Sequence, residues 1–302
     1  WPFWFGKKAR HWVLENISGG TISNGAIDVS LAAGRIPEHP EPLVFAQNEL
    51  HISFDAKDTG VRFLPGMPAS TTTSGHFDMQ DRHVKIAISA GQLPLPSGKH
   101  LTGSKGVFEI ADISHKPMMA SLAITAAGEA AAAAEFSGFK PIDALSKLPF
   151  AATDITGSIK ADIGAVFSLE KAHNPPQPAW DVTLALADVG LKQPLQGRKI
   201  SNVDASVTID TQTAVLKGTA DIDGTAFEVG LTEPFMKGPD SHRKWQIEGD
   251  LSEREILKLA PSLDGYVGGT VGLSISSDND AEHKAKMALT RAEISVPIFG
   301  WR

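Results

Sequence analysis

The sequence predicts a mainly β fold built from a dozen or more antiparallel strands, with a few short helices. Two observations support this. Over most of the 302 residues, apolar and polar side chains alternate with a period of two, which is typical of strands with one apolar face. Segments rich in Pro and Gly interrupt this alternation at short intervals. Both a closed sandwich or barrel and one long curved sheet with an apolar trough fit the pattern, and alternation alone does not separate them.

The chain is expected to begin with a short helix within KKARHWVLENISGG, residues 7–20. Gly19 and Gly20 supply a C-terminal stop. One face of a 3.6-residue period is formed by Ala9, Trp12, Val13, Asn16 and Ile17.

The longest expected strand is ITGSIKADIGAVFSL, residues 155–169. At about 3.3 Å per residue it would extend roughly 50 Å, well beyond an ordinary strand. Its apolar residues share one parity, and Gly157 is the only break. Asp223-Gly224 predicts a tight hairpin turn, because that pair tolerates positive φ.

Three further short helices are expected. Ser252 and Glu255 form a capping box for the segment that ends before Pro261. The alanine-rich residues 128–136 and the segment 141–149 can each form one or two helical turns. Turns and loops are expected in the Pro- and Gly-rich segments 34–42, 65–75, 94–106 and 173–178.

Composition excludes several classes of protein. With no cysteine, the chain has no disulfide, cysteine-ligated metal or thiol nucleophile. The net charge is -7, and no basic stripe is present to bind a phosphate backbone, so no nucleic-acid partner is expected. No uncharged apolar run reaches the 18 residues of a transmembrane helix.

The sequence contains few signals of catalytic chemistry. His76 with Asp78, and Asp81 with His83, have a spacing that would put each pair on one face of a strand, but solvated surface residues are the expected reading. The nucleophile elbow, the phosphate loop and the dinucleotide-binding glycine motif are absent. Residues 265–272 indicate a bulged strand, and residues 278–280 indicate a turn. We therefore expect no catalytic residue, metal or cofactor, and no enzyme.

The residues nevertheless resemble a known family. The stretch ARHWVLENISGG followed by TISNGAIDVSL, residues 9–31, resembles AsmA-like periplasmic proteins, in particular their YhdP-type branch. Residues 148–169, 181–191 and 213–231 have the strand and hairpin rhythm of that branch. The helix exit that carries the resemblance consists of Trp12, Val13, Asn16, Ile17, Gly19 and Gly20.

The resemblance implies a bridge-like lipid transfer protein. A long curved antiparallel sheet would form an open, taco-like apolar groove that shields phospholipid acyl chains between the inner and outer membranes. Residues 1–20 would follow a membrane anchor outside this chain, and residues 21–302 would form the groove, with a possible subdivision near 140–150. The chain would lie in the periplasm as a section of a longer protein, reaching both membranes through parts outside it.

No catalytic site comes with this family, so the expected site is a surface. The residues expected to line the groove are Leu50, Ile52, Phe54, Val84, Ile86, Ile88, Leu122, Ile124, Ile155, Ile159, Ile163, Phe167, Val182, Leu184, Leu186, Val207, Ile209, Leu273 and Ile275.

Two alternatives remain open. A structural or scaffolding β-protein would bury the same side chains in a closed core and bind no ligand. An enzyme or sugar-binding protein would need a polar cleft, and a chain with one tyrosine and 7% aromatic residues offers few stacking platforms for sugars.

Overall fold

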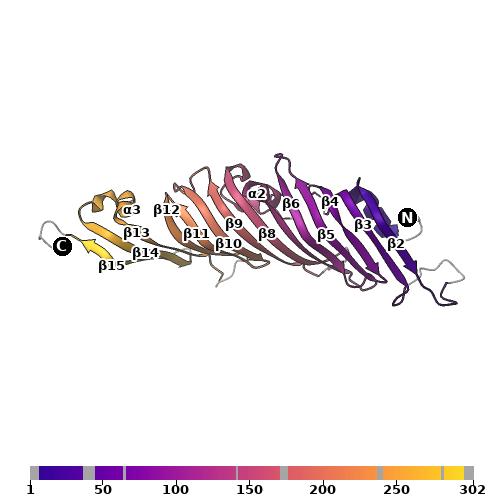
Figure 1. The fold of residues 1–302 in the computed structure, drawn as a ribbon. Helices are drawn as coiled ribbons and strands as arrows, with labels where there is room; N and C mark the ends of the chain where they lie inside the picture. Colours follow the sequence, from indigo (N-terminus) through magenta and orange to yellow (C-terminus); the bar gives the residue numbers. More distant parts are fainter. Residues whose placement is uncertain are drawn as a thin grey trace. The chain divides into compact units, whose positions relative to one another are not determined.

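The computed structural model describes residues 7–36, 45–63, 66–140, 142–170, 176–236, 241–279 and 282–295. These residues are mainly β, with three α-helices and 15 strands in one open antiparallel sheet (Figure 1). The predicted fold class is therefore confirmed at this level. The open sheet differs from the closed sandwich or barrel that the alternation also allowed.

The elements follow one another in a simple order. The helices are α1 (Lys7–Asn16), α2 (Ala130–Ser137) and α3 (Glu253–Leu259), with short 3-10 helices η1 (Leu145–Lys147), η2 (Ala152–Asp154) and η3 (Pro261–Leu263). The strands are β1 (Ile17–Ser18), β2 (Thr21–Val29), β3 (Leu50–Val61), β4 (Ser70–Gln80), β5 (His83–Pro94), β6 (His100–Ile110), β7 (Met119–Glu129), β8 (Ile155–Ser168), β9 (Ala179–Leu191), β10 (Ile200–Asp210), β11 (Thr213–Ile222), β12 (Thr225–Pro234), β13 (Lys244–Ser252), β14 (Val267–Asn279) and β15 (Glu282–Ile294).

Neighbouring strands in the sheet are neighbours in the sequence. From β3 to β15 each strand pairs with the next, and β1 and β2 both pair with β3. By its internal contacts the chain divides into two compact units. Unit 1 comprises Trp1–Leu148 and Lys160–Asp181, and unit 2 comprises Pro149–Ile159 and Val182–Arg302. Each unit is described by itself below.

Hairpin connections hold the strands in register. In unit 2, Asp223 and Gly224 have φ of 54° and 80°, and Ile222 pairs directly with Thr225. Two successive positive φ angles match the right-handed twist of the flanking strands. The Asp223 carboxylate accepts the backbone N–H of Lys199 at 2.9 Å, which ties this turn to the start of β10. The predicted hairpin is confirmed.

A β-bulge in β6 changes which residues share a face. Lys105 has φ of 52°, and the pairing of β6 with β7 shifts between Ser104 and Val107. A Cβ atom built at either Gly103 or Gly106 would lie 3.4 Å from Cδ1 of Ile124. One glycine is odd-numbered and the other even-numbered, so the extra residue of the bulge reverses the parity of β6 at this point.

The expected helices are present with different limits. α1 ends at Asn16, because Ile17 and Ser18 pair with β3. Ile17, the last residue of the predicted helix face, therefore lies outside the helix. α2 confirms the alanine-rich helix. In α3 the backbone N–H of Ser252 donates to Glu255 Oε2 at 2.8 Å, which confirms the capping box. The segment 141–149 forms only η1 in its described part.

Two predicted loops are largely strands, and that expectation was wrong. Residues 70–75 belong to β4, and residues 100–106 belong to β6. Glycine and small polar residues made these segments look like turns. In β4 a Cβ on Gly75 would lie 2.3 Å from the carbonyl oxygen of Ala87, so this glycine allows close strand contact rather than a turn. The loop predicted at 34–42 lies mostly outside the described residues, as does the first part of 173–178.

Each unit has a small core where a helix covers one end of the strands. In unit 1, Ala132 of α2 packs with Leu95 and Leu101. In unit 2, Ile256 of α3 packs with Phe227, Leu251 and Val271.

Candidate functional site: an apolar face on each unit

One apolar row crosses five strands of unit 1. The pairing places Phe54 opposite Phe77, Phe77 opposite Ile86, Ile86 opposite Phe108, and Phe108 opposite Leu122. Side chains of directly opposed residues in antiparallel strands point to the same side of the sheet. The rings of Phe54 and Phe77 stack with centroids 4.7 Å apart and planes 11° from parallel. The row is therefore a continuous strip of side chains across β3–β7.

A second row runs parallel to the first. It places Ile27, Ile52, Met79, Val84 and Ile110 in successive strands from β2 to β6. Because Ile52 and Phe54 are two residues apart on β3, the two rows share one face. With about 4.8 Å between neighbouring strands, hydrocarbon thus lines roughly 19 Å of the sheet from β2 to β6.

Phe167 of β8 extends this surface within unit 1. It packs against a cluster formed by Val84, Ile110 and Ala120, all of which are buried. Ile88 and Ile124 meet over Gly106, where a Cβ would approach them to within 2.8 Å and 3.4 Å. The glycine therefore makes room for two larger side chains on the same face.

Unit 2 carries an equivalent surface. One row places Val207, Leu216, Leu231 and Trp245 opposite one another from β10 to β13.

The neighbouring row of unit 2 crosses β10–β14 on the same side of the sheet. It consists of Ala205, Gly218, Val229, Ile247 and Ile275. Because Ala205 and Val207 are two residues apart on β10, the two rows belong to one face. We call these surfaces the apolar face of unit 1 and the apolar face of unit 2.

The register brings together many of the residues that the sequence singled out. The apolar face of unit 1 contains Leu50, Ile52, Phe54, Val84, Ile86, Ile88, Leu122, Ile124 and Phe167, which direct pairing, alternation along a strand or the contacts above connect. Ile163 is half-buried on β8 and has the same parity as Phe167, which places it on the same face. On the apolar face of unit 2 they are Val207, Ile209, Leu273 and Ile275.

The remaining expected residues lie on β8 and β9. Val182, Leu184 and Leu186 are half-buried and alternate with exposed residues along β9. Ile159 is buried and Ile155 half-buried near the start of β8, with Gly157 at φ of 89° between them.

Sequence reasoning missed four central members of the apolar face of unit 1. Phe77 and Met79 lie on β4, and Phe108 and Ile110 lie on β6. Each pair is spaced by two residues, so the signal was present. Glycine and polar residues precede both pairs, and the loops predicted at 65–75 and 94–106 end just before them, which hides the alternation.

Within the described residues, every strand belongs to this one sheet, and no second sheet packs on either apolar face. At the edges the apolar side chains meet solvent. Ile27 on β2 is 70% exposed, and so is Met287 on β15, opposite Leu273. The helices α2 and α3 cover only the ends where the two small cores lie.

The opposite side of unit 1 is polar. His51 Nε2 lies 2.8 Å from Asp78 Oδ2, and His76 Nδ1 lies 2.7 Å from Asp55 Oδ1. The hydrogen bond with Asp78 raises the pKa of His51. These contacts link β3 to β4 through side-chain hydrogen bonds, and the described residues contain no group of three or more side chains that could hold a metal ion. The His76–Asp78 spacing thus serves cross-strand pairing.

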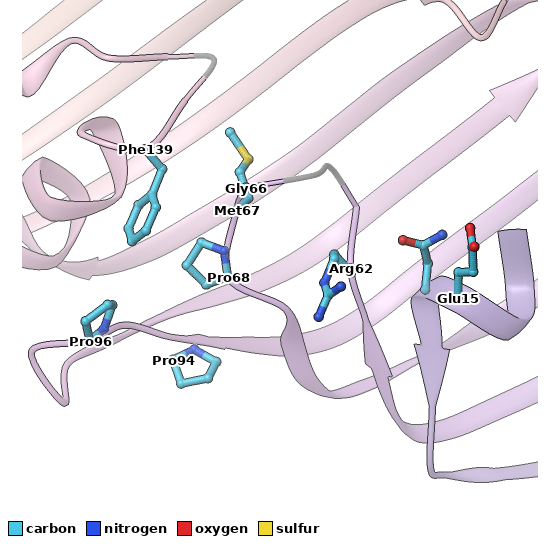
Figure 2. Close-up of a pocket in the computed structure, with 9 residues that line it drawn as sticks. Glu15, Arg62, Gly66, Met67, Pro68, Pro94, Pro96 and Phe139 are labelled. Carbon is cyan, nitrogen blue, oxygen red and sulfur yellow. The ribbon is translucent and has the colours of Figure 1, made fainter.

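A pocket of about 840 Å³ lies at one end of unit 1 (Figure 2). Four parts of the chain line it: the end of α1, the segment between β3 and β4, the end of β5 with the turn after it, and the segment after α2. Its walls include Met67, Pro68, Pro94 and Phe139, and its charged residues are Glu15 and Arg62.

Comparisons with protein-family models, with curated proteins and with solved structures found no match to this chain. Among the described residues, no helix has the length and hydrophobicity needed to cross a membrane.

Proposed function

We propose that this chain is a section of a lipid transport protein and that its two apolar faces line an open groove for phospholipid acyl chains. The observation that supports this most directly is the set of apolar rows that continue from strand to strand, with no second sheet on them among the described residues. Monomeric proteins rarely leave contiguous apolar patches of more than a few hundred Å² uncovered.

The energetics of such a surface suit transport. Each methylene group of an acyl chain costs about 0.8 kcal/mol to expose to water, and an apolar lining removes that cost at every position along it. Aliphatic and aromatic side chains carry no fixed charge, so the free energy of a bound lipid has no deep minimum at any one position along the groove. A lipid is therefore sheltered but free to move, as a conduit requires.

The proposal includes the setting implied by the resemblance to AsmA-like proteins. The protein would act in the periplasm, tethered to the inner membrane, and would carry lipid between the inner and outer membranes, which it reaches through parts outside these residues. No catalytic step is needed, so the proposed role is not enzymatic.

The first test is lipid co-purification with a matched pair of variants. Ile86 lies on the apolar face of unit 1, and the next residue, Ala87, is exposed on the opposite side of β5. We expect native mass spectrometry of the gently purified chain to show bound phospholipid. Ile86→Asp should lower the retained lipid by at least about ten-fold, because it buries a charge among acyl chains, whereas Ala87→Asp should not.

Circular dichroism and thermal unfolding check that each variant folds. If Ile86→Asp does not fold, Met287→Asp is the substitute, because Met287 lies on the apolar face of unit 2 and is 70% exposed. A wild-type chain that retains no lipid and binds no hydrophobic dye would contradict the proposal. A structural protein with a sealed core would then be the better account.

A further inference from the structure

The pocket of unit 1 joins an apolar wall to two opposite charges. Pro94 is the last residue of β5, and Arg62 directly follows β3, so the pocket lies at the ends of two strands that carry the apolar face. Phe139, on another wall, packs against the cluster of Leu95, Leu101 and Ala132. Its hydrocarbon lining therefore adjoins the core at that end of unit 1.

Arg62 is the pocket residue best placed to receive an anion. Its backbone N–H donates to the carbonyl oxygen of Asn16 at 2.8 Å, which fixes the main chain. Its side chain is exposed, and its guanidinium makes no hydrogen bond or ion pair with any residue that the structure describes. A guanidinium binds phosphate oxygens through two parallel N–H donors, so it recognises a phosphate better than a single ammonium does.

Glu15 adds a negative charge to the pocket, which a ligand must also complement. Its carboxylate lies 3.0 Å from Nε2 of His11 and remains 60% exposed, so it still presents negative charge to the pocket. Figure 2 shows Glu15 and Arg62 on neighbouring parts of the pocket wall. A ligand with only negative charge would meet repulsion from Glu15, whereas a ligand with a phosphate and an ammonium would complement both side chains.

We propose that this pocket binds the head group of a zwitterionic phospholipid. The phosphate would pair with Arg62 and the ammonium with Glu15, while the acyl chains lie along Met67, Phe139 and the apolar face of unit 1. This inference rests on the proposed function, since it assumes that the apolar face holds acyl chains. A pocket of about 840 Å³ is large enough for a head group and the first part of its chains.

The test uses head-group selectivity. The chain is incubated with vesicles that contain equal amounts of phosphatidylethanolamine and phosphatidylglycerol with the same acyl chains. It is then repurified, and the retained lipids are quantified by mass spectrometry. We expect phosphatidylethanolamine to exceed phosphatidylglycerol by roughly two- to five-fold, the factor that an exposed ion pair provides.

The two pocket variants have different expected effects. Glu15→Gln should bring the ratio of the two lipids to about one. Arg62→Ala should lower retention of both lipids by roughly two- to five-fold. Arg254→Ala and Glu228→Gln, which make the same chemical changes in unit 2, should behave as the wild type does.

Two results would overturn the inference. If the wild type retains lipid with no head-group preference, or if the pocket variants match the wild type, the pocket does not read the head group, although the proposed function stands. If the wild type retains no lipid at all, both proposals fail. Because Arg62 and Glu15 are exposed, neither substitution is expected to prevent folding.

Discussion

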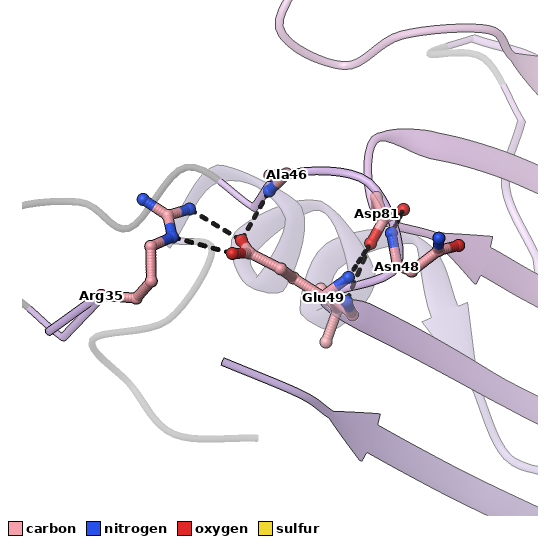
Figure 3. Close-up of polar contacts among 6 residues, drawn as sticks. Arg35, Ala46, Asn48, Glu49 and Asp81 are labelled. Carbon is pink, nitrogen blue, oxygen red and sulfur yellow. Dashed lines mark hydrogen bonds and ion pairs between the residues drawn. The ribbon is translucent and has the colours of Figure 1, made fainter. Parts of the chain in front are cut away.

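Two acidic side chains fix the turn that leads into β3 (Figure 3). Asp81 accepts the backbone N–H groups of Asn48, Glu49 and Leu50 at 2.6 Å, 2.9 Å and 2.8 Å. Glu49 accepts two hydrogen bonds from Arg35, both at 2.7 Å, and one from the backbone N–H of Ala46. Polar anchors thus hold the start of a strand whose first side chain, Leu50, is buried.

This arrangement makes stability depend on pH. The hydrogen bonds from Arg35, together with the one from the backbone N–H of Ala46, lower the pKa of Glu49 from 4.5 to about 2. A carboxyl group whose pKa is lower in the folded state stabilises that state above its ordinary pKa, and the stabilisation is lost as the pH falls through the lowered value. We expect Glu49→Gln to have a lower unfolding midpoint than the wild type at pH 6, with the difference shrinking between about pH 4.5 and about pH 2.

Urea unfolding at a series of pH values measures this difference. Glu228→Gln serves as the control, because Glu228 is exposed and makes no hydrogen bond or ion pair within the described part of the chain. Its midpoint should follow that of the wild type throughout. A Glu49→Gln difference that stayed constant down to pH 2, or grew at acid pH, would refute the role given to Glu49.

At the scale of single elements, the short helix α3 packs over the ends of three strands in unit 2 and buries their apolar side chains. Ile256 is 6% exposed and packs on Phe227, Leu251 and Val271 from three different strands. Lys258 Nζ also donates to the carbonyl oxygen of Asp223 at 2.6 Å, which ties the helix to the β11–β12 turn. A helix of seven residues has little stability alone, so this packing must hold it.

Truncating the Ile256 side chain should destabilise unit 2. We expect Ile256→Ala to lower the free energy of unfolding by about 2–5 kcal/mol, because it removes buried methyl groups and leaves a cavity. Ile294→Ala makes the same change at a side chain that is 48% exposed on β15 and should cost less than about 1 kcal/mol. Chemical denaturation followed by circular dichroism compares them, and equal losses would show that α3 is not anchored through Ile256.

The elements also show how far sequence reasoning extends. The local sequence pattern predicted β8 through its alternation, the Asp223-Gly224 hairpin through its turn residues and the capping box of α3 through the spacing of Ser252 and Glu255. It failed for β4 and β6, where Gly75 and the bulge at Lys105 interrupt the period. A bulge is a relation between two strands, so a single-strand pattern cannot reveal it.

The same limit applies to the candidate site. Ile86 and Leu122 were recognised as apolar strand positions, but Phe108, which lies between them, was not. The register also depends on pairing partners far apart in the sequence. The pocket around Arg62 gave no sequence signal, because its walls come from segments separated by tens of residues.

At the scale of the whole molecule, a long run of sequential antiparallel pairings keeps one side of each unit apolar. Each strand adds a few side chains to a surface that no single residue defines. Function assigned to such a surface should tolerate conservative substitutions such as Ile→Leu and fail when a charge is introduced.

The most direct test of lipid binding by the apolar faces is site-specific photocrosslinking. A photoreactive amino acid is placed at Ile86 or Ile247 on the apolar faces, and at their neighbours Ala87 or Gln246 on the other side of the same strands. After irradiation with phospholipid vesicles, we predict lipid adducts at Ile86 and Ile247 and none at Ala87 and Gln246. Adducts at all four positions alike, or at none, would contradict the account.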